Sequence, residues 1–112
     1  MHEDFSINGL SPSEYCNQTP LDERMKAVQN EILSFSEDKL FNFQSSGTTG
    51  KPKQLQFSFN QLKASSEITH KAFNLSPKSK VLHALPMIYV AGKMMLYRSL
   101  IMGYDLWITE AK

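Results

Sequence analysis

Hydrophobic residues recur along the chain with two periods: about 3.6 residues, which is typical of helices, and two residues, which is typical of strands. The first helical stretch follows Thr19, which is expected to be the N-cap, with Pro20 at the first helical position and Asp22 near the positive end of the helix dipole. We predict a helix over 21–35 that packs on a sheet. Its apolar stripe comprises Leu21, Met25, Val28, Ile32 and Phe35.

Two segments with alternating hydrophobic residues predict short strands at 40–44 (LFNFQ) and 55–59 (LQFSF). A polar loop, 45–53, lies between them and contains no apolar side chain except that of proline. The pattern therefore predicts two strands joined by an unusually polar connection.

A second helix is predicted over 61–73, and Ser58 or Asn60 is expected to cap it. Three apolar residues at helical spacing are expected to form its buried face: Ala64, Ile68 and Ala72. The helix is followed by a polar turn.

The last third of the chain is more apolar. KVLHAL, 80–85, predicts a buried strand that Pro86 ends, and 92–102 predicts a largely buried helix closed by Gly103 in a left-handed conformation. YDLWIT, 104–109, predicts a final strand. Because helices alternate with strands, the fold class is α/β.

The 112 residues match the size of one domain. Residues 1–18 have no clear period and are expected to form an irregular N-terminal arm, which leaves 19–112 as the folded unit. Twelve basic and eleven acidic side chains give a net charge of +1, so charge provides no reason to expect nucleic acid or an anionic membrane as a partner.

A cytoplasmic location is expected from three features. Cys16 is the single cysteine and cannot form an internal disulfide, and we interpret it as a spectator thiol in a reducing compartment. The first residues are acidic and polar, unlike a secretory signal. The apolar region 81–104 is interrupted by charged residues and proline, so it predicts a buried strand and helix and not a membrane span.

The loop SSGTTGKPK, Ser45–Lys53, combines two glycines, four hydroxyls and two lysines. Glycines allow close approach of a ligand to the backbone, successive amides can form an anion nest, and hydroxyls and lysines add donors and charge. The combination suits a polyphosphate. The spacing differs from that of the P-loop of NTPases and from the dinucleotide fingerprint. A polar hairpin uses similar residues, but this string arises by chance in such a chain with a probability on the order of 10⁻⁷.

The string resembles the phosphate-loop signature of the adenylate-forming superfamily, which includes acyl- and aryl-CoA synthetases, luciferases and peptide-synthetase adenylation domains. In that family the loop joins two strands and closes on the phosphates of MgATP. One local departure is Gln54, where the family often has glycine. The resemblance implies that the ATP phosphates are bound by Ser45, Ser46, Gly47, Thr48, Thr49, Gly50, Lys51 and Lys53.

A second segment, Leu85–Ile108, resembles the family's L-P-[LM]-x-H-x-x-G motif with its following helix and strand. Tyr89 stands where many members have histidine, and with Gly92 it is implied to border the acyl-substrate pocket; a core aromatic is the alternative for Tyr89. Arg98 is a third candidate for that pocket, as a partner of an anionic substrate group, although a structural role is the more common one. Met94 and Met95 are interpreted as core residues, and His83 as a hydrogen-bonded core residue.

The details AGKMM and YRSL are most similar to short bacterial o-succinylbenzoate–CoA ligases of menaquinone synthesis. The resemblance implies an acid–CoA ligase that uses ATP, Mg²⁺, a small carboxylic acid and coenzyme A.

The family's later signatures are absent, so its main catalytic lysine and acidic residue are expected outside these residues. We therefore expect a partial N-terminal domain with helices on an incomplete sheet, little activity alone, and self-association through an exposed sheet edge. The alternatives are a non-catalytic nucleotide- or phosphate-binding module and a small interaction domain.

Overall fold

The computed structural model describes residues 1–44, 50–51, 53–84, 87 and 90–109. The α/β class is confirmed. The elements are β1 (Ser6–Ile7), α1 (Pro12–Cys16), α2 (Glu23–Leu33), β2 (Leu40–Gln44), β3 (Gln54–Ser58), α3 (Phe59–Ala72), β4 (Lys80–His83), α4 (Val90–Met102) and β5 (Asp105–Ile108).

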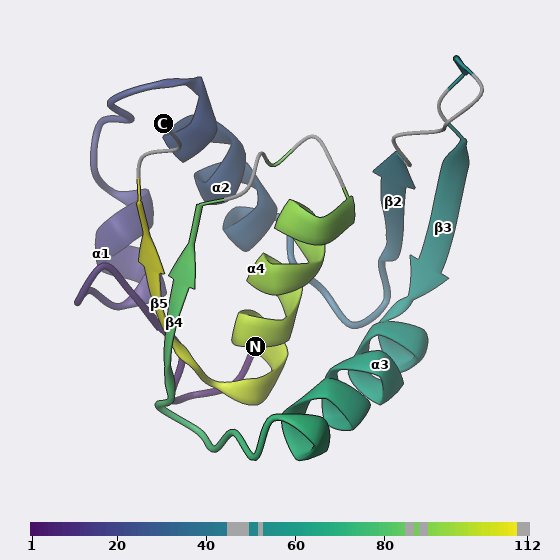
Figure 1. Ribbon diagram of the computed structural model, residues 1–112. Coiled ribbons are helices and arrows are strands. Elements are labelled where there is room, and N and C mark those ends of the chain that lie inside the picture. The colour runs from purple at the N-terminus through teal and green to yellow at the C-terminus, as the bar shows by residue number, and fades with distance from the viewer. Residues whose placement is uncertain (45–49, 52, 85–86, 88–89, 110–112) are drawn as a thin grey trace.

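Two separate sheets organise the described residues (Figure 1). One is a parallel sheet of three strands in the order β1-β5-β4, in which Lys80 pairs with Asp105 and Ser6 pairs with Asp105 from the other side. Helix α4 connects β4 to β5 and lies between this sheet and the second one. The second sheet is the antiparallel β2–β3 hairpin, and α3 follows it and packs on α4.

The strand predictions around the polar loop are confirmed, with β3 beginning and ending one residue earlier than expected. Phe41 and Phe43 on alternate positions of β2 are buried, while Leu40 and Asn42 face outward. The ring centroid of Tyr97 from α4 lies 4.9 Å from that of Phe41 and 5.7 Å from that of Phe43. The hairpin is thus anchored to α4 through aromatic packing.

Helix α2 begins later than predicted. Its N-cap is Asp22 and not Thr19, because the Asp22 carboxylate accepts a hydrogen bond of 2.8 Å from the Met25 amide. Leu21 precedes the helix and is 91% exposed, so it does not belong to the apolar stripe. Val28 and Ile32 are buried as expected.

The buried face of α3 also differs from the prediction. Ser58 caps the helix in a capping box with Gln61, which is one of the two expected caps. However, Ala64, Ile68 and Ala72 are exposed, and the buried residues are Leu62 and Ser66. Ser66 tolerates burial because its hydroxyl donates to the Leu62 carbonyl at 2.7 Å, and its small side chain allows close packing.

The first eighteen residues are more regular than expected. They contain β1, which pairs with β5, and α1, which begins with a capping box between Ser11 and Glu14. Gln29 of α2 is buried and donates to the carbonyls of Tyr15 and Gln18, which ties α1 to α2. The N-terminal segment therefore forms part of the packed structure.

The helix at the end of the chain follows the prediction closely. Helix α4 begins two residues before the expected start and ends at Met102, and Gly103 adopts the expected left-handed conformation with φ of +79°. Within the described ranges, no helix is both long enough and apolar enough to cross a membrane.

Candidate functional site

The candidate site lies at the end of the molecule where β2, β4 and β5 terminate and α4 begins (Figure 1). The carboxyl ends of neighbouring parallel strands are a common place for ligand sites in α/β proteins. The polar loop starts at the same end, after Gln44, and returns at Gln54, which pairs with Gln44 across the hairpin.

Several predicted site residues lie outside the described ranges: Ser45, Ser46, Gly47, Thr48, Thr49 and Tyr89. The described ones are Gly50, Lys51, Lys53, Gly92 and Arg98. The topology brings the two ends of the loop to the same side of the molecule as the start of α4. It therefore places the loop ends and Gly92 at one end of the fold.

Gly50 shows why the loop needs glycine. Its φ is +88°, and a Cβ added there would meet no heavy atom within 4 Å. The requirement at this position is thus the left-handed backbone and not close packing. Lys51 and Lys53, which follow Gly50 in the loop, are exposed to solvent.

A cluster around Glu31 holds the hairpin against α4. The carboxylate of Glu31 lies 3.6 Å from Lys93 Nζ and 3.8 Å from Lys39 Nζ, and it accepts a hydrogen bond from the Tyr97 hydroxyl. Lys93 also donates to the Asn42 carbonyl of β2 at 3.2 Å. Burial, reinforced by the Glu31 carboxylate, raises the pKa of Tyr97, so its hydroxyl remains a donor.

A second set of contacts, the Arg24–His83–Gly92 network, fixes the start of α4. His83 is fully buried, and its Nε2 lies 2.8 Å from the Gly92 carbonyl oxygen. Arg24 Nη2 lies 3.0 Å from His83 Nδ1 and 2.9 Å from the His83 carbonyl oxygen, and Nη1 donates to the Thr109 carbonyl.

The partners assign the tautomer of His83. A carbonyl only accepts and a guanidinium only donates, so Nε2 carries the proton and Nδ1 accepts. The interpretation of His83 as a hydrogen-bonded core residue is confirmed. Burial lowers the pKa of His83, and the positive charge of Arg24 acts in the same direction.

This geometry predicts that acid destabilises the fold through His83. The unfolded chain protonates His83 near pH 6.5 and the folded chain at lower pH, so the unfolded state binds more protons below that pH. The stabilisation that neutral His83 provides is complete above about pH 6.5. Below that pH, the free energy of unfolding falls by up to about 1.4 kcal/mol per pH unit until the pKa of His83 in the folded chain is reached.

Urea unfolding of the parent chain and of His83→Gln between pH 7.5 and 5 measures the effect. The difference in acid sensitivity between these two proteins separates the effect of His83 from any effect of His2 and His70. Parallel pH profiles for the two proteins would show that His83 is not the group responsible.

Arg98 lies apart from Gly92, about 9 Å further along the axis of α4. It lines a cavity of about 290 Å³ between α3, α4 and β4, with Phe73 and Met95 among its apolar walls. Its Nε is buried, and no residue that the structure describes forms a hydrogen bond with it. The assignment of Gly92 and Arg98 to one acyl pocket stays a prediction.

The positioning residues Arg24, Glu31 and Lys93 were missed by the sequence analysis. Lys93 was visible as a charged residue inside an apolar helix, which signals a partner for its charge. Arg24 and Glu31 are half-buried on α2 beside the apolar stripe, and their sequence positions gave no such signal. Among the described side chains, no group of three or more His, Cys, Asp or Glu residues could hold a metal ion.

Comparisons with known proteins add the following. No family profile and no curated protein sequence matches the chain. Among solved structures, it is similar to an acyl-CoA synthetase (AMP-forming)/AMP-acid ligase II-like protein from Dyadobacter fermentans, with 28% identity and a TM-score of 0.76. That alignment covers 91% of this chain and 29% of the other.

Two further solved structures share the fold. The o-succinylbenzoate coenzyme A synthetase of Bacillus subtilis, in complex with ATP and magnesium ion, is 23% identical with a TM-score of 0.58, over 75% of this chain and 20% of that one. ATP-bound MatB from Rhodopseudomonas palustris is 25% identical with a TM-score of 0.53, over 67% of this chain and 15% of that one.

The chain thus spans less than a third of the length of each of these three structures. Its structural neighbours are AMP-forming acyl-CoA synthetases and related adenylate-forming enzymes, and they support the resemblance to that superfamily, whereas the assignment of the loop residues stays a prediction.

Proposed function

We propose that this chain is part of an ATP-dependent acid–CoA ligase. The observation that carries the proposal is the SSGTTGKPK string between the paired strands β2 and β3, at the end of the fold where α4 begins. The likeness to the AMP-forming protein of Dyadobacter fermentans supports the same reaction class.

In the proposed reaction, a carboxylate oxygen of the acid attacks the α-phosphorus of ATP and pyrophosphate leaves. The thiolate of coenzyme A then attacks the acyl carbon of the adenylate and AMP leaves. The loop residues 45–51 and Lys53 bind the β- and γ-phosphates and stabilise the charge on the departing pyrophosphate. Mg²⁺ would be held through the phosphates of the nucleotide and would neutralise part of their charge.

The acyl pocket, the acid and the pathway are part of the same proposal. Tyr89, Gly92 and Arg98 line the acyl pocket, and the main catalytic lysine and acidic residue lie outside the given sequence. The acid is 2-succinylbenzoate, which would place the enzyme in menaquinone synthesis in the cytoplasm. This assignment rests on the AGKMM and YRSL details, and Arg98 supplies a cation that suits a second carboxylate.

The test is acid-dependent exchange of pyrophosphate into ATP by protein from the complete reading frame, with a panel of acids that includes 2-succinylbenzoate. Exchange with that acid and no other is the expected result. Exchange with a different acid would support the proposed reaction but show that 2-succinylbenzoate is not the substrate. Absence of exchange with every acid, by protein that binds ATP, would reject the ligase.

A second candidate is a nucleotide-binding module without catalysis, because the polar loop by itself suits a polyphosphate. The 112-residue chain itself provides the test. ATP binding in equilibrium dialysis, with loss of binding in Lys53→Ala, combined with a stop codon after Lys112, would support the module. A reading frame that continues with further superfamily signatures would support the ligase.

A further inference from the structure

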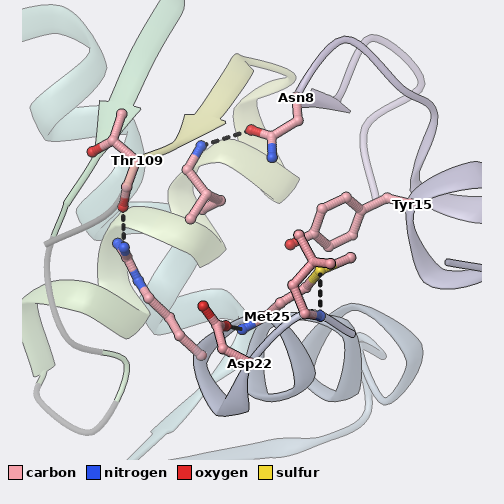
Figure 2. Close-up of a pocket in the computed structure, with 8 residues that line it drawn as sticks. Asn8, Tyr15, Asp22, Met25 and Thr109 are labelled. Carbon is pink, nitrogen blue, oxygen red and sulfur yellow. Dashed lines mark hydrogen bonds between the residues drawn. The ribbon is translucent and has the colours of Figure 1, made fainter. Parts of the chain in front are cut away.

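A cavity separate from the candidate nucleotide site lies where α1, α2 and β5 meet, across α4 from the β2–β3 hairpin (Figure 1). Its volume is about 490 Å³, within the range of small-molecule sites. It opens beside the carboxyl end of β5 in the parallel sheet. Figure 2 shows its lining residues: Asn8, Tyr15, Leu21, Asp22, Arg24, Met25, Ile108 and Thr109.

Tyr15 is a core aromatic that also places a hydroxyl in this cavity. Its side chain is 2% exposed, and Figure 2 shows the hydroxyl directed toward the middle of the lining residues. No residue within the described ranges forms a hydrogen bond with that hydroxyl. The hydroxyl is not one of the polar atoms that are wholly closed to solvent, so it is accessible from the cavity and available to a bound ligand.

Asn8 adds a second donor to the lining of the cavity. Its Oδ1 accepts a hydrogen bond of 2.8 Å from the Ile108 amide, which orients the side chain and leaves the Nδ2 group as a donor (Figure 2). Burial raises the pKa of Tyr15, so its hydroxyl is protonated at neutral pH and donates as well. Two converging donors suit one carbonyl oxygen of a ligand.

The charges at the rim indicate the charge of that ligand. Arg24 and Asp22 carry opposite charges on the first turn and N-cap of α2, so their fields largely cancel in the cavity. Leu21, Met25 and Ile108 provide apolar surface. The surroundings thus suit a molecule without net charge that has an apolar ring.

We propose that this cavity is a binding site for a small, uncharged aromatic or cyclic amide. The carbonyl oxygen of the ligand accepts from Tyr15 Oη and Asn8 Nδ2, its N–H donates toward the Asp22 carboxylate, and its ring packs on Met25 and Ile108. The site is independent of the proposed ligase reaction, because it shares no residue with the loop or the implied acyl pocket.

Three probes of nearly identical shape test whether the cavity prefers an uncharged ligand: benzamide is neutral, benzoate is an anion and benzamidine is a cation. Each is titrated into the ¹⁵N-labelled 112-residue chain at pH 7, with the Asn8 side-chain amide and the Ile108 backbone amide as reporters. We expect benzamide to bind with a dissociation constant on the order of 1 mM. Benzoate and benzamidine are expected to bind at least about tenfold more weakly. In the proposed pose, benzoate places an anionic oxygen against the Asp22 carboxylate, and benzamidine places an N–H donor against the donors of Tyr15 and Asn8.

Tyr15→Phe removes only the hydroxyl and should weaken benzamide binding about fivefold to tenfold. Asn8→Asp keeps the acceptor for Ile108, removes the donor and should weaken binding as well. Tyr104→Phe is the control, because it removes a tyrosine hydroxyl beside the cavity that Arg98 lines, where that hydroxyl lies 2.9 Å from His70 Nδ1, and it should leave the affinity for benzamide unchanged.

Three results would overturn the proposal. They are no shift at Asn8 or Ile108 with 20 mM benzamide, equal affinities for the three probes, and an unchanged benzamide affinity in Tyr15→Phe. Because no described residue bonds the Tyr15 hydroxyl, Tyr15→Phe is expected to keep its urea midpoint. A lower midpoint would mean that the hydroxyl has an internal partner, and it would count against the site too.

Discussion

Replacing Phe41 by alanine is expected to lower the free energy of unfolding by about 3–5 kcal/mol. The Phe41 side chain is fully buried, and its ring centroid lies 4.9 Å from that of Tyr97 and 5.7 Å from that of Phe35. Truncation removes apolar burial and leaves a cavity between β2 and α4, which the surrounding aromatic rings fill only in part. Because these rings anchor the hairpin, the loss also loosens the base of the candidate loop.

Leu40→Ala is the matched control for this experiment. Leu40 precedes Phe41 in the same strand, but it is 56% exposed and points away from the core. Its replacement is expected to change stability by no more than about 0.5 kcal/mol. Urea unfolding followed by the fluorescence of Trp107 measures both variants, and similar losses in the two would show that β2 does not face the core as described.

Lys53→Ala is expected to lower the rate of acid-dependent ATP–pyrophosphate exchange about 100-fold in protein from the complete reading frame. The proposed loop stabilises charge that develops on the pyrophosphate, and a lysine that meets this charge acts mainly in the transition state. Removing such an interaction lowers kcat and kcat/KM together. The comparison of the two constants for ATP therefore distinguishes a role in the reaction from a role in binding alone.

Lys63→Ala serves as the control, since Lys63 is an exposed lysine on α3, which follows the hairpin. It removes the same charge without touching the loop and should leave exchange within twofold of the parent, about 0.4 kcal/mol in activation free energy. Equal effects of the two substitutions would assign the loss to net charge. If neither substitution changes the exchange rate, Lys53 does not act at the phosphate site.

The hairpin could be predicted because its pattern is local. Alternation in LFNFQ and LQFSF depends on neighbours two residues apart, and both strands pair with each other across a short connection. The face of α3 could not be predicted in the same way. Its sequence offers two overlapping stripes, and packing on α4 selects the one with Leu62 and Ser66, although the more apolar one contains Ile68.

The N-terminal segment was missed because its partners are distant in sequence. The two residues of β1 have no period of their own, and they pair with β5, where Ser6 lies opposite Asp105. The contacts that position the candidate site depend on similar long-range pairs. Arg24 reaches His83 and Thr109, and Glu31 reaches Tyr97. Spacing along one helix cannot reveal such partners, whereas the motif residues were identified from the sequence alone.

The Arg24–His83–Gly92 network also makes the part of the molecule that contains α2, β4 and α4 stiffer than the β2–β3 hairpin. A single buried imidazole joins α2, the end of β4 and the start of α4, so a hinge between these elements would have to break hydrogen bonds that water does not replace. The hairpin is held differently, by ring contacts that tolerate sliding and by one described hydrogen bond from Lys93. If an anion binds the proposed loop, we therefore expect the hairpin to be the part that adjusts and the sheet with α4 to be the part that stays fixed.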